Sequence, residues 1–168
     1  SRAFRDGFGI DIAFGIKGVH LTGAQTGVVG GTFYLANSQS FFNASNGFYS
    51  WTEQNINNSG AWPREINAMA FPDPLTGFAV GHNFSILKTT NGGAGWNAST
   101  NISQELWAIS MLNAQQGIAV GDKAVLTTTN GGSSWITTNP NWFMRAVSMG
   151  SPSVVYAGGD AFFLKSTT

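Results

Sequence analysis

One short motif occurs twice in the chain, and this repetition limits the possible folds more than any other feature. Residues 89–96 read Thr-Thr-Asn-Gly-Gly-Ala-Gly-Trp, and residues 128–135 read Thr-Thr-Asn-Gly-Gly-Ser-Ser-Trp. Similar strand-like runs precede both copies. Internal repetition with a period of about forty residues is typical of solenoids and propellers. The chain is therefore an array of one repeated unit.

Each unit places apolar runs ahead of this motif at constant spacing. The second run begins nine residues beyond the central Ala of the first run in three clear copies, at Ala68, Ala108 and Ala146. A more divergent copy near the N-terminus carries a longer insertion before Trp51. The first runs are 16–21, 66–71, 106–111 and 144–149, the second runs are 27–31, 77–81, 117–121 and 155–159, and the third runs are 86–89, 125–128 and 163–166. The unit is thus a succession of short strands.

The Asn-Gly-Gly motif joins the third run to a fourth strand. Asn-Gly followed by Gly favours a tight hairpin, because the turn requires positive φ and glycine adopts it without a Cβ clash. The Asn side chain can also close a local hydrogen bond in such a turn. Trp96 and Trp135 come just after the turns. We expect their indoles to cover the strand ends and to wedge against the next blade.

Four short strands per unit make one blade, so the sequence predicts an all-β protein with a β-propeller fold. We expect about four blades of four antiparallel strands in one domain, 1–168, that forms part of a larger propeller, for example a seven-bladed one. If four blades close alone, residues 3–14 would supply the strand that the last blade lacks, because their apolar residues alternate with period two. The predicted blades span 16–56, 66–101, 106–140 and 144–168.

Composition excludes several classes of function. Apolar residues make up 42% of the chain, enough for a core, whereas charged residues make up 10% and the net charge is zero. The basic residues are scattered and form no basic patch that could bind nucleic acid. There is no cysteine for disulfides or thiol catalysis, and no apolar run approaches the roughly 20 residues of a membrane-spanning helix. His20 and His82 lie in different blades without carboxylates at ligand spacing, so we expect no metal site and no cofactor.

The motif resembles the Asp-box of sialidase-like propellers, with Asn91 and Asn130 at the Asp position. The wider unit, Gly-x-Ala-Val-Gly followed by Leu-x-Thr-Thr-Asn-Gly-Gly-x-x-Trp, resembles the repeats of photosystem II assembly and stability factors of the Ycf48 type. The resemblance covers residues 66–168 well and residues 16–51 weakly. It implies a seven-bladed propeller without enzymatic activity that binds a partner protein during assembly. It also implies a thylakoid-associated or lumenal location.

A binding site is expected at one rim of the propeller. That rim is formed where the innermost strands begin and where the second strands continue into the third, and its residues differ from blade to blade while the Asn-Gly-Gly turns do not. Variation on a constant scaffold is how loops acquire function. The predicted partner-binding residues are Asn67, Trp107, Arg145, His82, Asp122 and Asp160. The family's binding surface is rich in Arg, and only Arg145 matches it here.

These rim residues also admit other interpretations. Arg145 could form an exposed ion pair with Asp160 or Asp122. Trp107 could stack on a sugar or a peptide, or could fill an ordinary core or rim position. Asp122 and Asp160 occupy equivalent positions in adjacent blades, so a glycoside hydrolase with two carboxylates about 5 to 9 Å apart is a third class of function. Equivalence by repetition is the simpler explanation of the two, and we predict no catalytic residue.

Asn-x-Ser sequons provide the basis for a second hypothesis, an extracellular glycosylated repeat protein with a structural or glycan-binding role. Such sequons also arise by chance in a chain rich in Asn and Ser. The sequence leaves the partner, the oligomeric state and the choice between a thylakoid and a secreted protein open. The candidate glycosylation sites are Asn43, Asn57, Asn83, Asn97 and Asn101.

Overall fold

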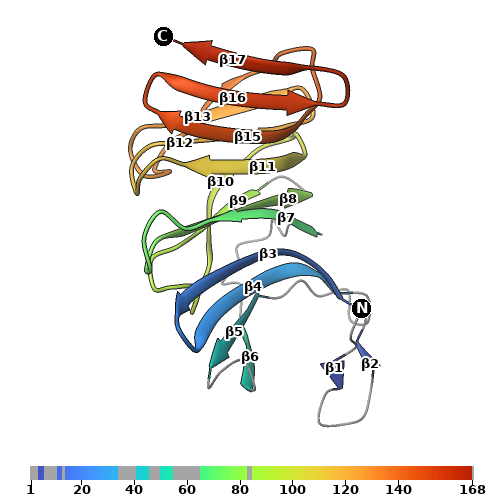
Figure 1. Ribbon diagram of the computed structural model, residues 1–168, viewed down its shortest axis with the longest axis vertical. Coiled ribbons are helices and arrows are strands. Elements are labelled where there is room, and N and C mark those ends of the chain that lie inside the picture. Colours follow the sequence, from blue (N-terminus) through green and yellow to red (C-terminus); the bar gives the residue numbers. More distant parts are fainter. Residues whose placement is uncertain are drawn as a thin grey trace.

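The computed structural model describes residues 4–5, 11–12, 14–33, 41–45, 50–54, 65–82 and 85–167. The described part consists of strands joined by turns and loops (Figure 1). An N-terminal pair contains β1 (Phe4–Arg5) and β2 (Asp11–Ile12). Blade 1 contains β3 (Phe14–Gly23), β4 (Thr26–Phe33), β5 (Phe41–Ser45) and β6 (Ser50–Gln54).

The remaining strands form three further blades. Blade 2 contains β7 (Glu65–Ala70), β8 (Gly77–His82), β9 (Ser85–Thr89) and β10 (Asn97–Asn101). Blade 3 contains β11 (Leu106–Met111), β12 (Gly117–Gly121), β13 (Ala124–Thr128) and β14 (Ile136–Thr138). Blade 4 contains β15 (Met144–Ser151), β16 (Val154–Gly159) and β17 (Phe163–Thr167).

Each blade is an antiparallel meander in which neighbouring strands follow one another in the sequence. The first strands lie side by side, β3 against β7, β7 against β11 and β11 against β15. The blades therefore follow one another along the molecule, from blade 1 to blade 4 (Figure 1). This arrangement confirms the predicted all-β propeller fold.

The N-terminal segment 3–14 was expected to close the ring only if four blades close alone. Its described residues pair with each other, Phe4 with Ile12 and Arg5 with Asp11. They lie at the end of the molecule opposite β17 (Figure 1). Among the described residues, blade 4 has three strands, and closure by segment 3–14 stays a prediction.

The two Asn-Gly-Gly turns have the same hydrogen-bonded structure. The backbone N–H of Gly132 donates to the buried hydroxyl of Thr128 at 2.9 Å, and that hydroxyl donates to Asn130 Oδ1 at 3.0 Å. Asn130 Oδ1 also accepts the backbone N–H of Ser134 at 3.0 Å. Gly131 and Gly132 have φ of 65° and 76°, so the predicted positive-φ turn is confirmed.

The tryptophans after these turns pack between blades. Trp96 is 0% exposed and belongs to a cluster that includes Val28 of blade 1. Trp135 meets Phe78 of blade 2 edge-on, with 6.3 Å between ring centroids. Both indoles therefore contact the preceding blade, and the expectation of contact with the next blade was wrong. The reason is that the turn before Trp135 is itself hydrogen-bonded to blade 2, through Lys88 and Ser99.

The turn backbone adds hydrogen bonds to this interface. Lys88 Nζ of β9 donates to the carbonyl of Gly131 at 2.6 Å, and the hydroxyl of Ser99 in β10 donates to the carbonyl of Gly132. The indole Nε1 of Trp135 donates to the same Ser99 hydroxyl at 3.3 Å. Blade 3 is thus attached to blade 2 at its outer end as well as through its inner strand.

Substitution of the second glycine in this turn is expected to destabilise the protein. A Cβ at Gly132 would lie 2.8 Å from Phe78 Cε1, and the φ of 76° disfavours any residue with a side chain. We expect Gly132→Ala to lower the free energy of unfolding by about 2 to 4 kcal/mol, measured by chemical denaturation. A Cβ at Gly95 meets its nearest atom at 3.5 Å. Gly95→Ala is therefore the matched control, with a change within about 0.5 kcal/mol. Equal effects of the two substitutions would contradict the close approach of the turn to blade 2.

His20 links blade 1 to blade 2 and is expected to make stability depend on pH. Its ring stacks on that of Phe71 with 4.1 Å between centroids, and burial lowers the pKa of His20. The folded protein therefore binds this proton less readily than the unfolded chain. The contribution is fully present above the ordinary histidine pKa of about 6.5 and is lost as the pH falls below it. His20→Phe should flatten the pH dependence of the free energy of unfolding between about pH 5 and 7. An unchanged slope would show that His20 is not its source.

Candidate functional site

The six predicted rim residues lie where the repeat places them. Asn67, Trp107 and Arg145 are the second or third residues of β7, β11 and β15. The others lie at the ends of the second strands, His82 as the last residue of β8, and Asp122 and Asp160 directly after β12 and β16. Strand pairing brings the two sets together, because the start of each first strand faces the end of the second.

Four of these residues, Trp107, Arg145, Asp122 and Asp160, form one contact group, which we call the rim cluster. The guanidinium carbon of Arg145 lies 4.2 Å from the centre of the Trp107 ring. The indole Nε1 of Trp107 donates to Asp122 Oδ1 at 2.8 Å. A cation held against an indole gains a cation–π attraction of about 0.5 to 1 kcal/mol at an exposed site. Trp107 therefore positions the only arginine of the predicted site.

Arg145 lies between two carboxylates from adjacent blades. Its Nε is 3.5 Å from Asp160 Oδ1, and its Nη1 is 4.0 Å from Asp122 Oδ1. The side chains of Arg145 and Asp160 are 41% and 74% exposed. Ion pairs as exposed as this contribute less than about 1 kcal/mol to stability. The expected ion pairing is present, and it leaves the guanidinium and the Asp160 carboxylate accessible to a partner.

Asn67 and His82 lie outside the rim cluster. Asn67 Nδ2 donates to the carbonyl of Leu106 at 2.8 Å, so this side chain joins β7 to β11. His82 Nδ1 lies 3.0 Å from Glu105 Oε1. Sequence reasoning did not single out Glu105, although Glu65 precedes the first run of blade 2 at the same repeat position. The recurrence of glutamate at this repeat position could have indicated Glu105.

Exposed aromatic residues flank the rim cluster and were not predicted. The connection from blade 3 to blade 4 contains Trp142 and Phe143, which are 51% and 44% exposed. Phe143 forms a β-bridge with Asp122, and Lys123 Nζ lies 5.7 Å from the Phe143 ring centre. Lys123 itself has φ of 54°, a conformation uncommon for a residue with a side chain. Apolar contact area thus lies next to the charges of the rim cluster.

The structure describes the candidate glycosylation sites unevenly. Asn97 is exposed at the start of β10. The hydroxyl of its sequon belongs to Ser99, which bonds to the turn of blade 3. Asn43 and Asn101 lie in β5 and β10, whereas Asn57 and Asn83 lie outside the described residues. Occupancy of the five sequons stays a prediction.

Among the described residues, no group of three histidine or acidic side chains converges as a metal site would require. Within the same residues, no helix has the length and apolarity to cross a membrane.

The repeat, the turn and the rim define a class of protein, the Asp-box-like β-propellers. Comparison with known families narrows it further. Residues 48–161 match the family model described as photosynthesis system II assembly factor YCF48, which covers more than half of the chain. The chain belongs to this family. No curated protein is similar enough in sequence to give a match.

Solved structures with the same fold include two YCF48 proteins. YCF48 bound to a D1 peptide is 18% identical, with a TM-score of 0.68 over 98% of this chain and 53% of that chain. YCF48 from Cyanidioschyzon merolae is 14% identical, with a TM-score of 0.63 over 90% of this chain and 50% of that chain. An ancestral GH74 enzyme is 20% identical, with a TM-score of 0.63 over 90% of this chain and 22% of that chain. The chain thus spans about half the length of the two YCF48 structures.

The hydrogen bond from Trp107 to Asp122 is expected to matter more for stability than the charge of Asp122. Asp122→Asn keeps an acceptor for the partly buried indole N–H and removes only the exposed ion pair, so the free energy of unfolding should fall by less than about 1 kcal/mol. Asp122→Leu removes the acceptor and should cost about 1 to 3 kcal/mol. Chemical denaturation of both variants measures the difference. A larger loss for the Asn variant would contradict this division of roles.

Proposed function

We propose that this chain is a noncatalytic protein-interaction module that acts as a photosystem II assembly factor of the YCF48 family. In this proposal the rim cluster binds an extended segment of a partner protein. The observation that carries it is the half-exposed guanidinium of Arg145, which Trp107 holds in place at the rim. Membership of the family and the fold shared with YCF48 bound to a D1 peptide support it.

The chemistry of the rim favours a polar peptide with at least one carboxylate. Asp160 is 74% exposed and lies 3.5 Å from Arg145 Nε, so a partner carboxylate can replace it at little cost. A bidentate carboxylate on a guanidinium makes a stronger, charge-assisted contact than the single one present here. Trp142 and Phe143 add apolar area beside it. Binding should need little change in the backbone, because the rim is built on the ends of paired strands.

Two observations favour binding over hydrolysis, although a GH74 enzyme shares the fold. The carboxylates of Asp122 and Asp160 both contact Arg145, and Asp122 also accepts the indole N–H of Trp107. A glycosidase instead requires one carboxyl that donates a proton and one that attacks or activates water. Their contacts make the two aspartates ion-pair partners that shape the rim.

In this proposal the four blades belong to a larger propeller. This agrees with the comparison, in which the chain covers about half of each YCF48 structure. The proposal implies a thylakoid-associated or lumenal location. An extracellular glycan-binding role is less consistent with the rim. One face of Trp107 is occupied by Arg145, and that face is not free to stack on a sugar.

Calorimetric titration with the D1 peptide bound in the YCF48 structure tests the proposal. We expect saturable binding by this chain and at least tenfold weaker binding by Arg145→Ala, a loss of about 1.4 kcal/mol or more. Arg145→Lys should restore only part of the affinity, because an ammonium cannot pair bidentately with a carboxylate. Lys165→Ala is the control, since it removes one exposed cation from β17 without touching the rim cluster.

Two results would contradict the proposal. Absence of binding by the unmodified chain would remove the D1 peptide as its partner. Binding that is equally strong in Arg145→Ala and in the unmodified chain would place the peptide away from the rim cluster. Circular dichroism of each variant checks that the blades are folded.

A further inference from the structure

Both described Asn-Gly-Gly turns contain an Asn-Gly step, Asn91-Gly92 in blade 2 and Asn130-Gly131 in blade 3. An asparagine followed by glycine is prone to deamidation, because glycine has no Cβ to hinder attack of its backbone nitrogen on the side-chain carbonyl carbon. Asn91 and Asn130 are exposed, so water and base reach both side chains in the folded protein. Any protection must therefore come from the hydrogen bonds of the turn. A third Asn-Gly step, at 46–47, lies outside the described residues.

The backbone nitrogen that would attack is hydrogen-bonded in both turns. The N–H of Gly92 donates to the carbonyl of Leu75 at 2.9 Å, and the N–H of Gly131 donates to the carbonyl of Gln115 at 2.8 Å. Each acceptor lies in the loop between the first two strands of the same blade. The nitrogen attacks only after it loses its proton, and the hydrogen-bonded N–H must first be released. Each turn therefore has to open locally before deamidation begins.

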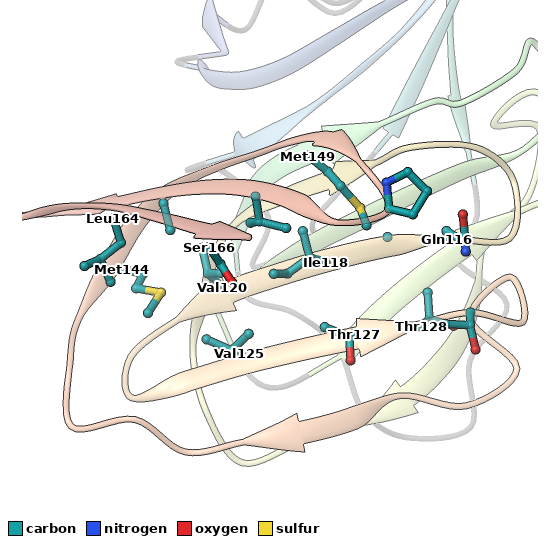
Figure 2. A pocket seen from close by; sticks show the side chains of 15 residues that line it. Gln116, Ile118, Val120, Val125, Thr127, Thr128, Met144, Met149, Leu164 and Ser166 are labelled. Atoms are coloured by element: carbon teal, nitrogen blue, oxygen red, sulfur yellow. The ribbon is translucent and has the colours of Figure 1, made fainter. Parts of the chain in front are cut away.

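The side-chain amide of Asn130 is held at both of its polar atoms. Its Oδ1 accepts the hydroxyl of Thr128 and the backbone N–H of Ser134, both at 3.0 Å. Its Nδ2, the group that leaves as ammonia on deamidation, donates to the hydroxyl of Ser134 at 2.8 Å. Thr128 lies at the end of β13, beside the loop that joins β11 to β12 and holds the attacking nitrogen (Figure 2). One small region of blade 3 thus restrains both reacting groups.

The turn of blade 2 lacks one of these restraints. Oδ1 of Asn91 accepts the hydroxyl of Thr89 at 2.8 Å and the backbone N–H of Gly95 at 3.0 Å. Position 95 is glycine where blade 3 has Ser134, so it offers no hydroxyl to Asn91 Nδ2. When the turn of blade 2 opens, its leaving group therefore has one hydrogen bond fewer to break.

Deamidation gives two products that affect the turn differently. Aspartate at position 91 would still accept the Thr89 hydroxyl and the Gly95 N–H, so the turn can form again. Isoaspartate adds a methylene to the backbone, because the chain then continues through the former side chain. The N–H of Gly93 donates to the same Thr89 hydroxyl at 3.0 Å, and the longer backbone moves Gly93 away from it. The isoaspartyl turn thus loses the bonds that position Trp96 between the blades.

We propose that Asn91 and Asn130 are modification sites, converted to aspartate or isoaspartate when their turns open, with Asn91 reacting first. The glycine nitrogen gives its proton to base and bonds to the asparagine Cγ, and the Cγ–Nδ2 bond breaks to release ammonia. Water then opens the five-membered ring. Cleavage of the bond from the ring nitrogen to Cγ yields aspartate, and cleavage of its bond to the main-chain carbonyl carbon yields isoaspartate. The overall reaction exchanges ammonia for water and needs no oxidant.

This modification limits how long the array of blades survives. A chain that opens and returns as aspartate regains its structure, whereas an isoaspartyl chain does not. The lifetime of the fold is therefore set by a rate of chemical modification as well as by its equilibrium stability.

Peptide mapping of the folded 168-residue chain tests the order of reaction. The chain is kept at mildly alkaline pH, and samples are digested with trypsin, which puts Asn91 in peptide 89–123 and Asn130 in peptide 124–145. Fragment-ion mass spectrometry locates each converted residue and distinguishes isoaspartate from aspartate. We expect Asn91 to deamidate about twofold to tenfold faster than Asn130, the factor for one hydrogen bond. Both should react at least tenfold more slowly than in the free tryptic peptides.

Two substitutions should change the rates in opposite directions. A Cβ at Gly95 would lie 3.5 Å from Asn91 Nδ2, an ordinary contact, so the hydroxyl of Gly95→Ser can reach that atom. Gly95→Ser should slow deamidation of Asn91 by about twofold to tenfold, and Ser134→Ala should accelerate that of Asn130 by a similar factor. Asn91→Asp has the tolerated product in place and should unfold at the same denaturant concentration as the unmodified chain.

Refolding separates the two products. After ageing in denaturant and dilution, isoaspartate at position 91 should be at least threefold depleted from the folded fraction, relative to aspartate at that position. Equal rates for Asn91 and Asn130 in the folded chain would overturn the proposed order. Rates as fast as in the free peptides would overturn protection by the turn. None of these measurements uses the D1 peptide, so failure here is distinguishable from failure of the rim to bind it.

Discussion

The array of blades depends on the contact between each Asn-Gly-Gly turn and the blade before it. A four-stranded sheet of this size has two large faces, and each face needs a neighbour to bury it. The inner strands alone bring the blades together at one end. At the outer end, Trp135 fills the space against Phe78, while Lys88 and Ser99 hold the turn backbone. Because the indole, the two glycines and the threonine act together, the motif recurs as a unit.

The same attachment explains why the rim can vary. The Asn-Gly-Gly turns lie at one end of the strands. The rim, where the first strands begin and the second strands end, lies at the other end. Stability is therefore concentrated away from the residues that differ between blades. Trp107, Arg145, Asp122 and Asp160 come from two adjacent blades, yet they meet through ordinary register. A repeat protein can thus change a binding surface at a small cost in stability.

Some features of the site were open to sequence reasoning and others were not. The rim positions of Trp107 and Arg145 follow from their place in the repeat, as does the ion pair with Asp160. The role of Asn67 in joining β7 to β11 does not, because it depends on the distance between two inner strands. The proximity of Phe143 to Asp122 was also missed. The connection between blades has no counterpart in the repeated pattern, so the pattern could not place it.

The sequence by itself determined the blade, because its information is local. Strand length, the positive-φ turn and the threonine–asparagine hydrogen bonds all depend on residues within a few positions of one another. Tertiary structure decided which neighbour each part contacts. The indole of Trp135 lies against the preceding blade rather than the next, and the guanidinium of Arg145 lies against Trp107. These contacts depend on how whole sheets pack face to face. The sequence repeat gives the spacing of the blades, but it does not tell which neighbouring blade a given side chain contacts.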